Sequence, residues 1–403
     1  MCDRQKLVRV VELTPTPPGN HFVQAKDRDV PQKSYPLELY FCESCAHVQL
    51  GHVVDPVILY RQNYSYVSGT SPVFVDHLRQ YAAHMQEKFN LEKGALITDI
   101  GSNDGTALSF FKQAGFRVVG VDPATEIVQI ARERGIDTEC EFFSTAVAKT
   151  LREKYGPAQL ITSHNACAHI DNLRDVILGV TNWLAADGLF VMEVGYVLDV
   201  YQNAWFDTIY HEHLDYHSVI PLVPFFAGLG LEVIDVQRVS PQGGSIRVVS
   251  QRKGGRYPVK NSVADIMALE REVGLDRAET FIAFNDSINE VKKRLRALVS
   301  ELKSQGKSIA GYGAPTKATT LLTHFDLGRV LDFLVDDNPL KQGLLSPGHH
   351  IPVVGAEEMY RRHPDYVLIL AWNFAENIMA RHRRYRDEGG RFILPMPDPR
   401  IAD

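Results

Sequence analysis

Residues 95–122 read ALITDIGSNDGTALSFFKQAGFRVVGVD, and this stretch specifies the type of fold. It begins with a short apolar strand, ALITDIG (95–101), which runs into a Gly-rich turn. A helix, TALSFFKQAG, and a second apolar strand, RVVGVD (117–122), follow directly. A strand, a turn, a helix and a strand in this order predict a βαβ unit, and hence a doubly wound parallel sheet.

The same alternation extends along most of the chain. Further strands are expected at AQLITSH (158–164), GLFVMEV (188–194), and an antiparallel pair, LEVIDVQRV and SIRVVSQR (231–252). One long helical region at 262–303 then leads into a second alternation from KSIAGYGAP (307–315) to RFILPMP (391–397). We therefore predict an α/β protein of three domains, with a small first module at 1–62, a central domain at 63–255 and a C-terminal Rossmann-like domain at 256–403.

Composition excludes several classes of protein. The chain has 403 residues, 43 basic and 49 acidic side chains and a net charge of −6, without a basic stretch of the kind that binds nucleic acid. It contains no apolar run of about 18 residues, and its start lacks the apolar core of a signal peptide. Five cysteines, an odd number, argue against a disulfide framework. We expect a cytoplasmic protein that binds neither membranes nor nucleic acids.

The turn DIGSNDG (99–105) indicates a cofactor site. Asp99 and Gly101 lie where bare backbone can approach a ligand at the carboxyl edge of the sheet. The next strand ends in Asp122, whose carboxylate is placed to accept hydrogen bonds from ribose hydroxyls. This spacing would also suit NAD, but the turn lacks Gly-x-Gly-x-x-Gly, and its acidic character opposes a pyrophosphate. A cationic sulfonium is tolerated, so we predict S-adenosylmethionine in preference to a nicotinamide or flavin cofactor or a purely structural turn.

A second cluster, YHEHLDYH (210–217), brings several titratable side chains together. Histidine transfers protons near neutral pH, and a glutamate can orient it. The alternatives are a metal site or a polar surface turn, although the histidines are two residues apart and not four, as in the helical zinc motif. We favour catalysis.

Two further motifs lie at strand ends. SHNACAHI (163–170) places Asn165 and His169 at the sheet edge, where the alternative for His169 is a buried structural role. GYGAPTK (311–317) follows a strand and opens a helix, so that Lys317 and helix amides could hold a phosphate. The alternative is a tight turn with an exposed lysine.

Cys42-x-x-Cys45 is half of a tetrahedral zinc site. Upstream, only Cys2 could add a thiolate, so the ligand set lacks one member. His21, His47 or His52 could complete it, or the start of the chain has lost a cysteine.

These motifs together resemble one family, the three-domain, S-adenosylmethionine-dependent C-methyltransferases that act on nucleotide-linked sugars, in particular at C-3 of dTDP-4-keto-6-deoxysugars. The resemblance covers nearly the whole chain, and YHEHL, GYGAPTK and DDNPLKQG are its most specific motifs. It implies an N-terminal zinc domain, a central class I methyltransferase domain and a Rossmann-like domain that binds substrate.

The resemblance also implies roles for matching positions. His213 is the expected base and Tyr210 its helper, with Glu212 and His169 in the same catalytic cluster. The substrate contacts expected are Tyr64, Asn165, Ser245, Arg247 and Lys317. The cofactor contacts expected are Asp99, Gly101, Asn103, Gly105, Asp122 and Phe143. The metal ligands expected are Cys2, Cys42 and Cys45, which would hold a structural Zn²⁺.

The expected reaction explains why a base is needed. Carbon is a poor nucleophile unless it carries enolate charge, and a 4-keto group acidifies the C-3 proton, so that one base can form the enolate. A nicotinamide-dependent oxidoreductase or epimerase is disfavoured, because no Tyr-x-x-x-Lys pair follows the first Rossmann-type turn. A non-catalytic zinc-ribbon binding protein would have lost the acid–base cluster, which is intact here.

Overall fold

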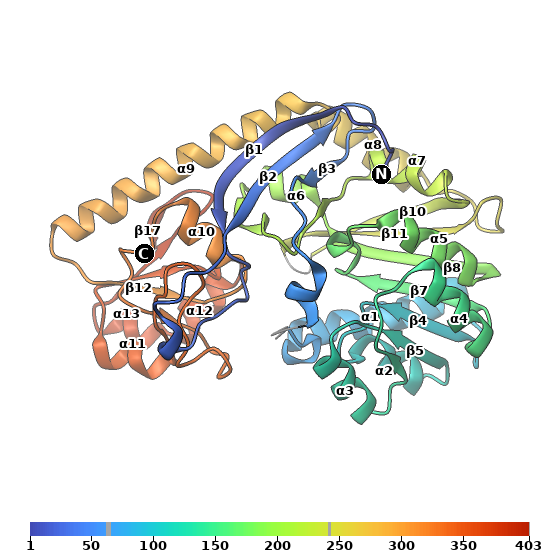
Figure 1. The fold of residues 1–403 in the computed structure, drawn as a ribbon, viewed down its shortest axis with the longest axis horizontal. Coiled ribbons are helices and arrows are strands. Elements are labelled where there is room, and N and C mark those ends of the chain that lie inside the picture. The colour runs from blue at the N-terminus through green and yellow to red at the C-terminus, as the bar shows by residue number, and fades with distance from the viewer. Residues whose placement is uncertain (62–65, 241–242, 403) are drawn as a thin grey trace.

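The computed structural model describes residues 1–61, 66–240 and 243–402. Its strands form three sheets of four, seven and six strands in this described part of the chain, and helices cover the two larger sheets (Figure 1). The predicted α/β class is confirmed. No helix among the described residues is long and apolar enough to span a lipid bilayer.

The N-terminal sheet is a long antiparallel ribbon with two short additions. Its strands are β1 (Leu7–Thr16), β2 (Tyr35–Cys42), β3 (Val48–Leu50) and β9 (Asp215–Tyr216), in the order β1-β2-β3-β9. In Figure 1 the ribbon of β1 and β2 arches from the central domain to the C-terminal domain. Strand β9, which follows the YHEHL segment, pairs with β3, so the sheet of the first module includes a strand from the central part of the chain.

The central sheet has the order β10-β11-β8-β7-β4-β5-β6, in which the last five strands are parallel and β11 is antiparallel to both of its neighbours. Its strands are β4 (Leu96–Ile100), β5 (Arg117–Val121), β6 (Thr138–Glu139), β7 (Ala158–His164), β8 (Leu184–Gly195), β10 (Leu231–Val239) and β11 (Ser245–Arg252). Every residue of β4 is buried, because helices cover both faces of the parallel part.

The helices of the central domain are α1 (Pro72–Phe89), α2 (Thr106–Gln113), α3 (Thr125–Glu133), α4 (Thr145–Tyr155), α5 (Leu173–Trp183), α6 (Val197–Gln202) and α7 (Val219–Ala227). Strand order reverses at β4, whose neighbours are β5 and β7. Ligands of open α/β sheets bind beyond the carboxyl ends of the strands at such a switch point. The DIGSNDG turn lies there.

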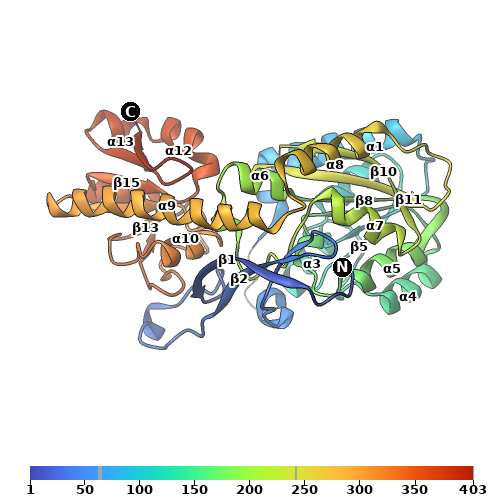
Figure 2. The same ribbon diagram turned by 90° about the horizontal axis from the view of Figure 1, so that it is seen from above.

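The expected helical region at 262–303 consists of two helices, α8 (Asn261–Val273) and α9 (Ala278–Ser304). Gly274 ends α8 in the left-handed conformation, with φ of +85°, which a side chain would disfavour. Helix α9 runs along the molecule from the central domain to the C-terminal domain (Figure 2), and Phe281 of α9 packs on Phe41 of β2.

The C-terminal sheet has the order β14-β13-β12-β15-β16-β17, parallel except for β17. Its elements are β12 (Ile309–Tyr312), α10 (Ala318–His324), β13 (Leu334–Val335), β14 (Val353–Val354), α11 (Ala356–Arg362), β15 (Tyr366–Ile369), α12 (Ala375–Arg381), α13 (Arg383–Asp387), β16 (Arg391–Leu394) and β17 (Arg400–Ala402). This is the Rossmann-type strand order, which confirms the predicted architecture of the domain.

Candidate active site

A cavity of about 820 Å³ lies beyond the carboxyl edge of the central sheet. The N-terminal part of the chain contributes Asn20 and Tyr60 to its wall, and the C-terminal domain contributes Pro315–Lys317 and Ala371–Phe374. The remaining wall consists of loops of the central domain. All three parts of the chain therefore enclose one space, and its volume suits a cofactor together with a substrate.

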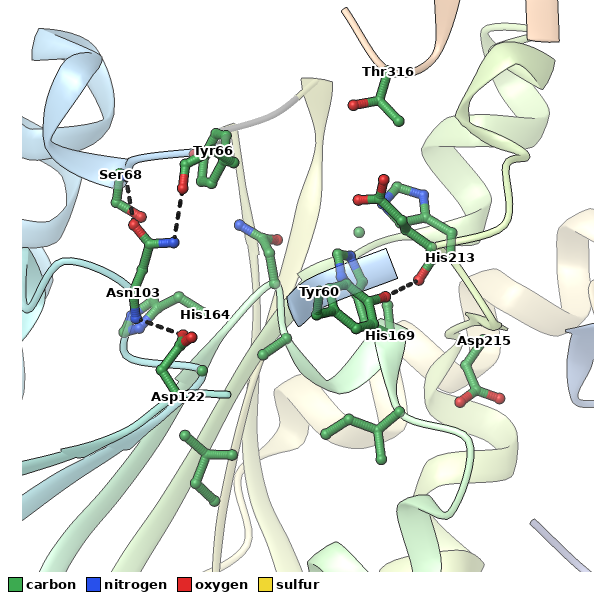
Figure 3. A pocket seen from close by; sticks show the side chains of 18 of the residues that line it. Tyr60, Tyr66, Ser68, Asn103, Asp122, His164, His169, His213, Asp215 and Thr316 are labelled. Carbon is green, nitrogen blue, oxygen red and sulfur yellow. Dashed lines mark hydrogen bonds between the residues drawn. The ribbon is translucent and has the colours of Figure 1, made fainter. Parts of the chain in front are cut away.

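The DIGSNDG turn forms one end of the cavity. Asp122, at the end of β5, accepts hydrogen bonds from the backbone N–H groups of Asn103 and Ala124, both at 2.9 Å. The Asn103 amide in turn accepts from Ser68 N at 2.8 Å and donates to Tyr66 O at 3.1 Å (Figure 3). Asn103 thus holds the turn against the segment that precedes α1.

The turn leaves no room for larger side chains at its start. Gly101 has φ of +72°, and a Cβ there would lie 2.4 Å from the Cβ of Ala166. Gly105 has φ of +75° and is the N-cap residue that precedes α2. Both glycines occupy backbone conformations that L-residues rarely adopt.

Some of the residues that line this end of the cavity have buried polar atoms without a hydrogen-bond partner. In the described residues, Asp99 Oδ1, Ser102 Oγ and both ring nitrogens of His164 are buried without a hydrogen-bond partner, and all three residues line the cavity. Burial raises the pKa of Asp99. Asp99 Oδ1 lies 3.8 Å from His164 Nδ1, which is too long for a hydrogen bond, and buried polar groups are normally paired, so these two groups have capacity for the polar groups of a ligand. They fit the hydroxyl and ammonium groups of S-adenosylmethionine.

The charges on the cavity wall favour a cationic ligand. Among the described residues eight acidic side chains line it and Lys317 is the one lysine or arginine. The acidic residues are Asp55, Asp99, Asp122, Glu141, Asp171, Asp175, Glu212 and Asp215. Phe143, assigned to the cofactor from the sequence, also lines the cavity and stacks on Trp183 at 6.1 Å between ring centroids.

At the other end, the YHEHL segment adopts an irregular conformation between a 3₁₀ turn (Phe206–Thr208) and β9. His213 Nδ1 lies 2.8 Å from the carbonyl oxygen of Thr208, and His213 Nε2 lies 2.8 Å from the Tyr210 hydroxyl. A carbonyl only accepts, so Nδ1 carries the proton of the neutral ring. Burial lowers the pKa of His213 to about 4. Near neutral pH, Nε2 therefore accepts a hydrogen bond from Tyr210.

His169 completes an aromatic group around this pair. Its ring centroid lies 5.0 Å from that of His213, and the Tyr60 ring stacks on it at 6.0 Å (Figure 3). Burial and the neighbouring His213 hold the pKa of His169 well below its usual value. His211 is turned away, since its Nε2 lies 3.3 Å from the Tyr35 carbonyl and it does not line the cavity.

Glu212 lines the cavity beside this pair and has a pKa raised to about 7 by burial. Its Oε1 accepts a hydrogen bond from Asn20 Nδ2 at 3.0 Å. Asn20 was not predicted as a site residue, although it ends the TPPGN stretch. The Tyr60 hydroxyl donates to the Glu212 carbonyl at 3.3 Å, and this residue was not predicted either.

The expected substrate residues are placed unevenly. Asn165 and Lys317 line the cavity, whereas Ser245 and Arg247 do not. Arg247 is buried in an ion pair with Glu193 at 2.9 Å. Tyr64 lies outside the described residues. Lys317 is half-buried, with 14% of its side chain exposed, and its Nζ donates to Asn373 Oδ1 at 3.0 Å.

The three cysteines expected to bind metal come together. The sulfur atoms of Cys2, Cys42 and Cys45 all lie within 4.8 Å of one another. Three thiolates in this arrangement fit a tetrahedral Zn²⁺ site.

The histidines considered for the fourth position do not belong to this group in the described structure. His47 Nε2 lies 2.6 Å from Asp215 Oδ1, His21 Nε2 lies 3.4 Å from the Ile58 carbonyl, and the His52 ring packs on Tyr35. Each of these rings has another neighbour, so the group found among the described residues consists of the three cysteines.

Three family models match the chain in succession. They are a zinc binding domain at residues 1–60, a methyltransferase domain at 73–236 and a C-methyltransferase C-terminal domain at 240–397. The chain is also 36% identical over 402 residues to the C-methyltransferase NovU of Streptomyces niveus. The aligned region covers all of this chain and 96% of the relative.

Solved structures of methyltransferases are similar to part of the chain. An S-adenosylmethionine-dependent methyltransferase from Clostridium acetobutylicum ATCC 824 is 15% identical with a TM-score of 0.36, over 45% of this chain and 92% of that one. The magnesium protoporphyrin IX methyltransferase of Synechocystis PCC 6803 is 14% identical with a TM-score of 0.34, over 44% and 79%. On the family matches and the full-length relative, the chain belongs to the S-adenosylmethionine-dependent C-methyltransferases that carry an N-terminal zinc-binding domain.

Proposed function

We propose that the protein methylates a nucleotide-linked 4-keto deoxysugar at C-3 through an enolate. The observation that carries this proposal is the Tyr210–His213 hydrogen bond of 2.8 Å in the cavity that also contains the DIGSNDG turn. A methyltransferase that acts on a hydroxyl can work with a nucleophile that already has a lone pair. A carbon acceptor needs a base first, and a buried tyrosine–histidine pair supplies one.

Tyr210 and His213 act together in the proposed proton transfer. The Nε2 lone pair of His213 is directed at the Tyr210 hydroxyl, so a proton taken from C-3 enters at the tyrosine oxygen while the phenol proton passes to Nε2. The C–H electron pair becomes the enolate, and Thr208 holds the histidine ring through Nδ1. Bound S-adenosylmethionine supplies the electrophilic methyl group to which the enolate carbon bonds.

Lys317 is the proposed contact of the substrate's diphosphate. It is the cation of an otherwise acidic wall in the described structure, and it lies at the carboxyl edge of the C-terminal sheet. A second cavity of about 370 Å³ adjoins this edge and shares Pro315, Ala371 and Phe374 with the first. We assign the nucleoside half of the substrate to this side, and Asn165 to the sugar.

The test is a screen of nucleotide-linked 4-keto deoxysugars with S-adenosylmethionine, analysed by mass spectrometry for a gain of one methylene group. The position of the new carbon is then read from the NMR spectrum of the product. Methyl transfer to an oxygen or nitrogen, or to a sugar without a keto group, would contradict the proposal.

A further inference from the structure

Asn20 connects the catalytic segment to the C-terminal domain. Its Nδ2 donates to Glu212 Oε1 at 3.0 Å, and its Oδ1 accepts from the Thr316 hydroxyl at 2.9 Å. Thr316 belongs to the GYGAPTK loop and is the neighbour of Lys317. One amide thus joins two loops that come from different domains, and the two bonds fix which end of the amide faces the carboxyl.

The backbone before Asn20 is pressed against the same loop. A Cβ on Gly19 would lie 2.4 Å from the Thr316 carbonyl oxygen, so a side chain there would force the segment and the loop apart. The Thr319 hydroxyl lies 3.4 Å from the Gly19 carbonyl, the long limit of a hydrogen bond, so it adds little to the close contact between Gly19 and Thr316. Asn20 is therefore placed by contacts with the C-terminal domain and not by its own secondary structure.

We propose that Asn20 is the positioning residue through which the GYGAPTK loop holds the Glu212 carboxyl in the active-site cavity. This inference rests on the proposed function for the role of Glu212, but its geometry does not depend on the identity of the sugar. Substrate that contacts Lys317 would bind beside the residue that fixes Asn20, so the nucleotide side of the cavity is linked directly to the catalytic segment.

The amide also affects the charge of Glu212. An N–H that donates to a carboxyl oxygen stabilises the ionised form, and here it opposes burial, which raises the pKa of Glu212 to about 7. Lys341, from the segment after β13, is the charged side chain that acts in the same direction. The two ring nitrogens of His213 face Thr208 and Tyr210, and the Tyr60 hydroxyl donates to the Glu212 backbone carbonyl.

The experiment follows the carboxyl of Glu212 directly, without a sugar substrate. Infrared difference spectra of the full-length protein against Glu212→Gln isolate its protonation as pH is varied. Asn20→Ala should move the midpoint upward by about one to two pH units, which corresponds to the loss of a hydrogen bond to a charged group. Gly19→Ala should shift it in the same direction, although it leaves every hydrogen-bonding side chain in place.

Two further variants distinguish positioning from general loosening of the interface. Thr316→Val keeps Asn20 but removes the hydrogen bond from Thr316 to its amide oxygen. We expect this variant to raise the Glu212 midpoint by less than Asn20→Ala does. Thr319→Val removes the neighbouring hydrogen bond without contact to Asn20 or Glu212, and should titrate like the wild type. A wild-type midpoint in both Asn20→Ala and Gly19→Ala, or an equal shift in Thr319→Val, would overturn the inference. A failure to methylate any keto sugar would instead refute the proposed function and leave this titration readable.

Discussion

The Tyr210 hydroxyl lies 2.8 Å from Nε2 of His213, so that the two side chains form a single proton-accepting unit. The histidine is buried and its pKa is lowered to about 4, which keeps the ring neutral across the physiological range. Removal of either member breaks the unit, because phenol alone is a weak base and the histidine lone pair points at the phenol. Both residues should therefore be required for proton abstraction.

Tyr210→Phe and His213→Asn should each slow methyl transfer by about 10² to 10⁴, the usual contribution of a general base. The affinity for S-adenosylmethionine, measured by calorimetry, should stay unchanged. With S-adenosylhomocysteine bound, the wild type should exchange the C-3 proton of the substrate with deuterated water, and neither variant should do so. His211→Asn is the matched control, since His211 faces Tyr35, and it should exchange normally. Wild-type exchange in Tyr210→Phe would assign the proton transfer to His213 alone.

Asp122→Ala should weaken the binding of S-adenosylmethionine by about 1–3 kcal/mol, through the loss of a buried acceptor. Asp122 also holds the backbone of Asn103, so part of the loss comes from a less ordered turn. Asp104→Asn provides the contrast. Asp104 belongs to the same turn but accepts from Gly69 and Thr106 and does not line the cavity. This variant should lower stability and leave affinity nearly unchanged. Equal affinity of Asp122→Ala and wild type in calorimetry would refute the assignment.

Zinc should contribute to folding and not to the reaction. Cys42→Ser, or removal of metal by a chelator, should lower the melting temperature by several degrees, since each kcal/mol of lost stability lowers it by about 2–4 °C. Turnover per folded molecule should change little, because the three sulfurs do not line the cavity. Cys140→Ser is the control, as Cys140 lies outside the sulfur group. Metal analysis that finds no zinc, together with a Cys42→Ser variant as stable as the parent, would contradict this prediction.

Lys317 should make substrate binding depend on pH. Burial lowers the pKa of its ammonium to about 8, so the charge that would hold a diphosphate is present below that pH and is lost above it. We expect the KM for the sugar nucleotide to rise as pH increases through about 8. Lys317→Gln should raise KM below about pH 8, where the wild-type lysine is charged, and should remove this inflection. If the inflection persists in Lys317→Gln, another group holds the phosphates.

Local sequence patterns are enough to predict much of this fold and the chemical character of its site. Strand β4 is an apolar run that leads into DIGSNDG. The turn needs a positive φ at Gly101, which glycine adopts without the steric clash of a side chain. The alternation of apolar strands and helices likewise follows from side-chain periodicity. The residue types of the YHEHL cluster, a tyrosine, a glutamate and two histidines, are themselves typical of acid–base chemistry.

Which side chains reach the cavity, in contrast, depends on the packing of the domains. YHEHL is irregular, and without a helical or strand period the sequence cannot tell that His213 points inward and His211 outward. Arg247 was expected to contact the substrate. Its strand instead places it in a buried ion pair with Glu193, because a buried charge is stable only beside an opposite charge. Asn20 meets Glu212 across 192 residues of chain. A contact between residues so far apart in the sequence depends on how the domains pack. It produces no periodic pattern in the local sequence from which it could be predicted.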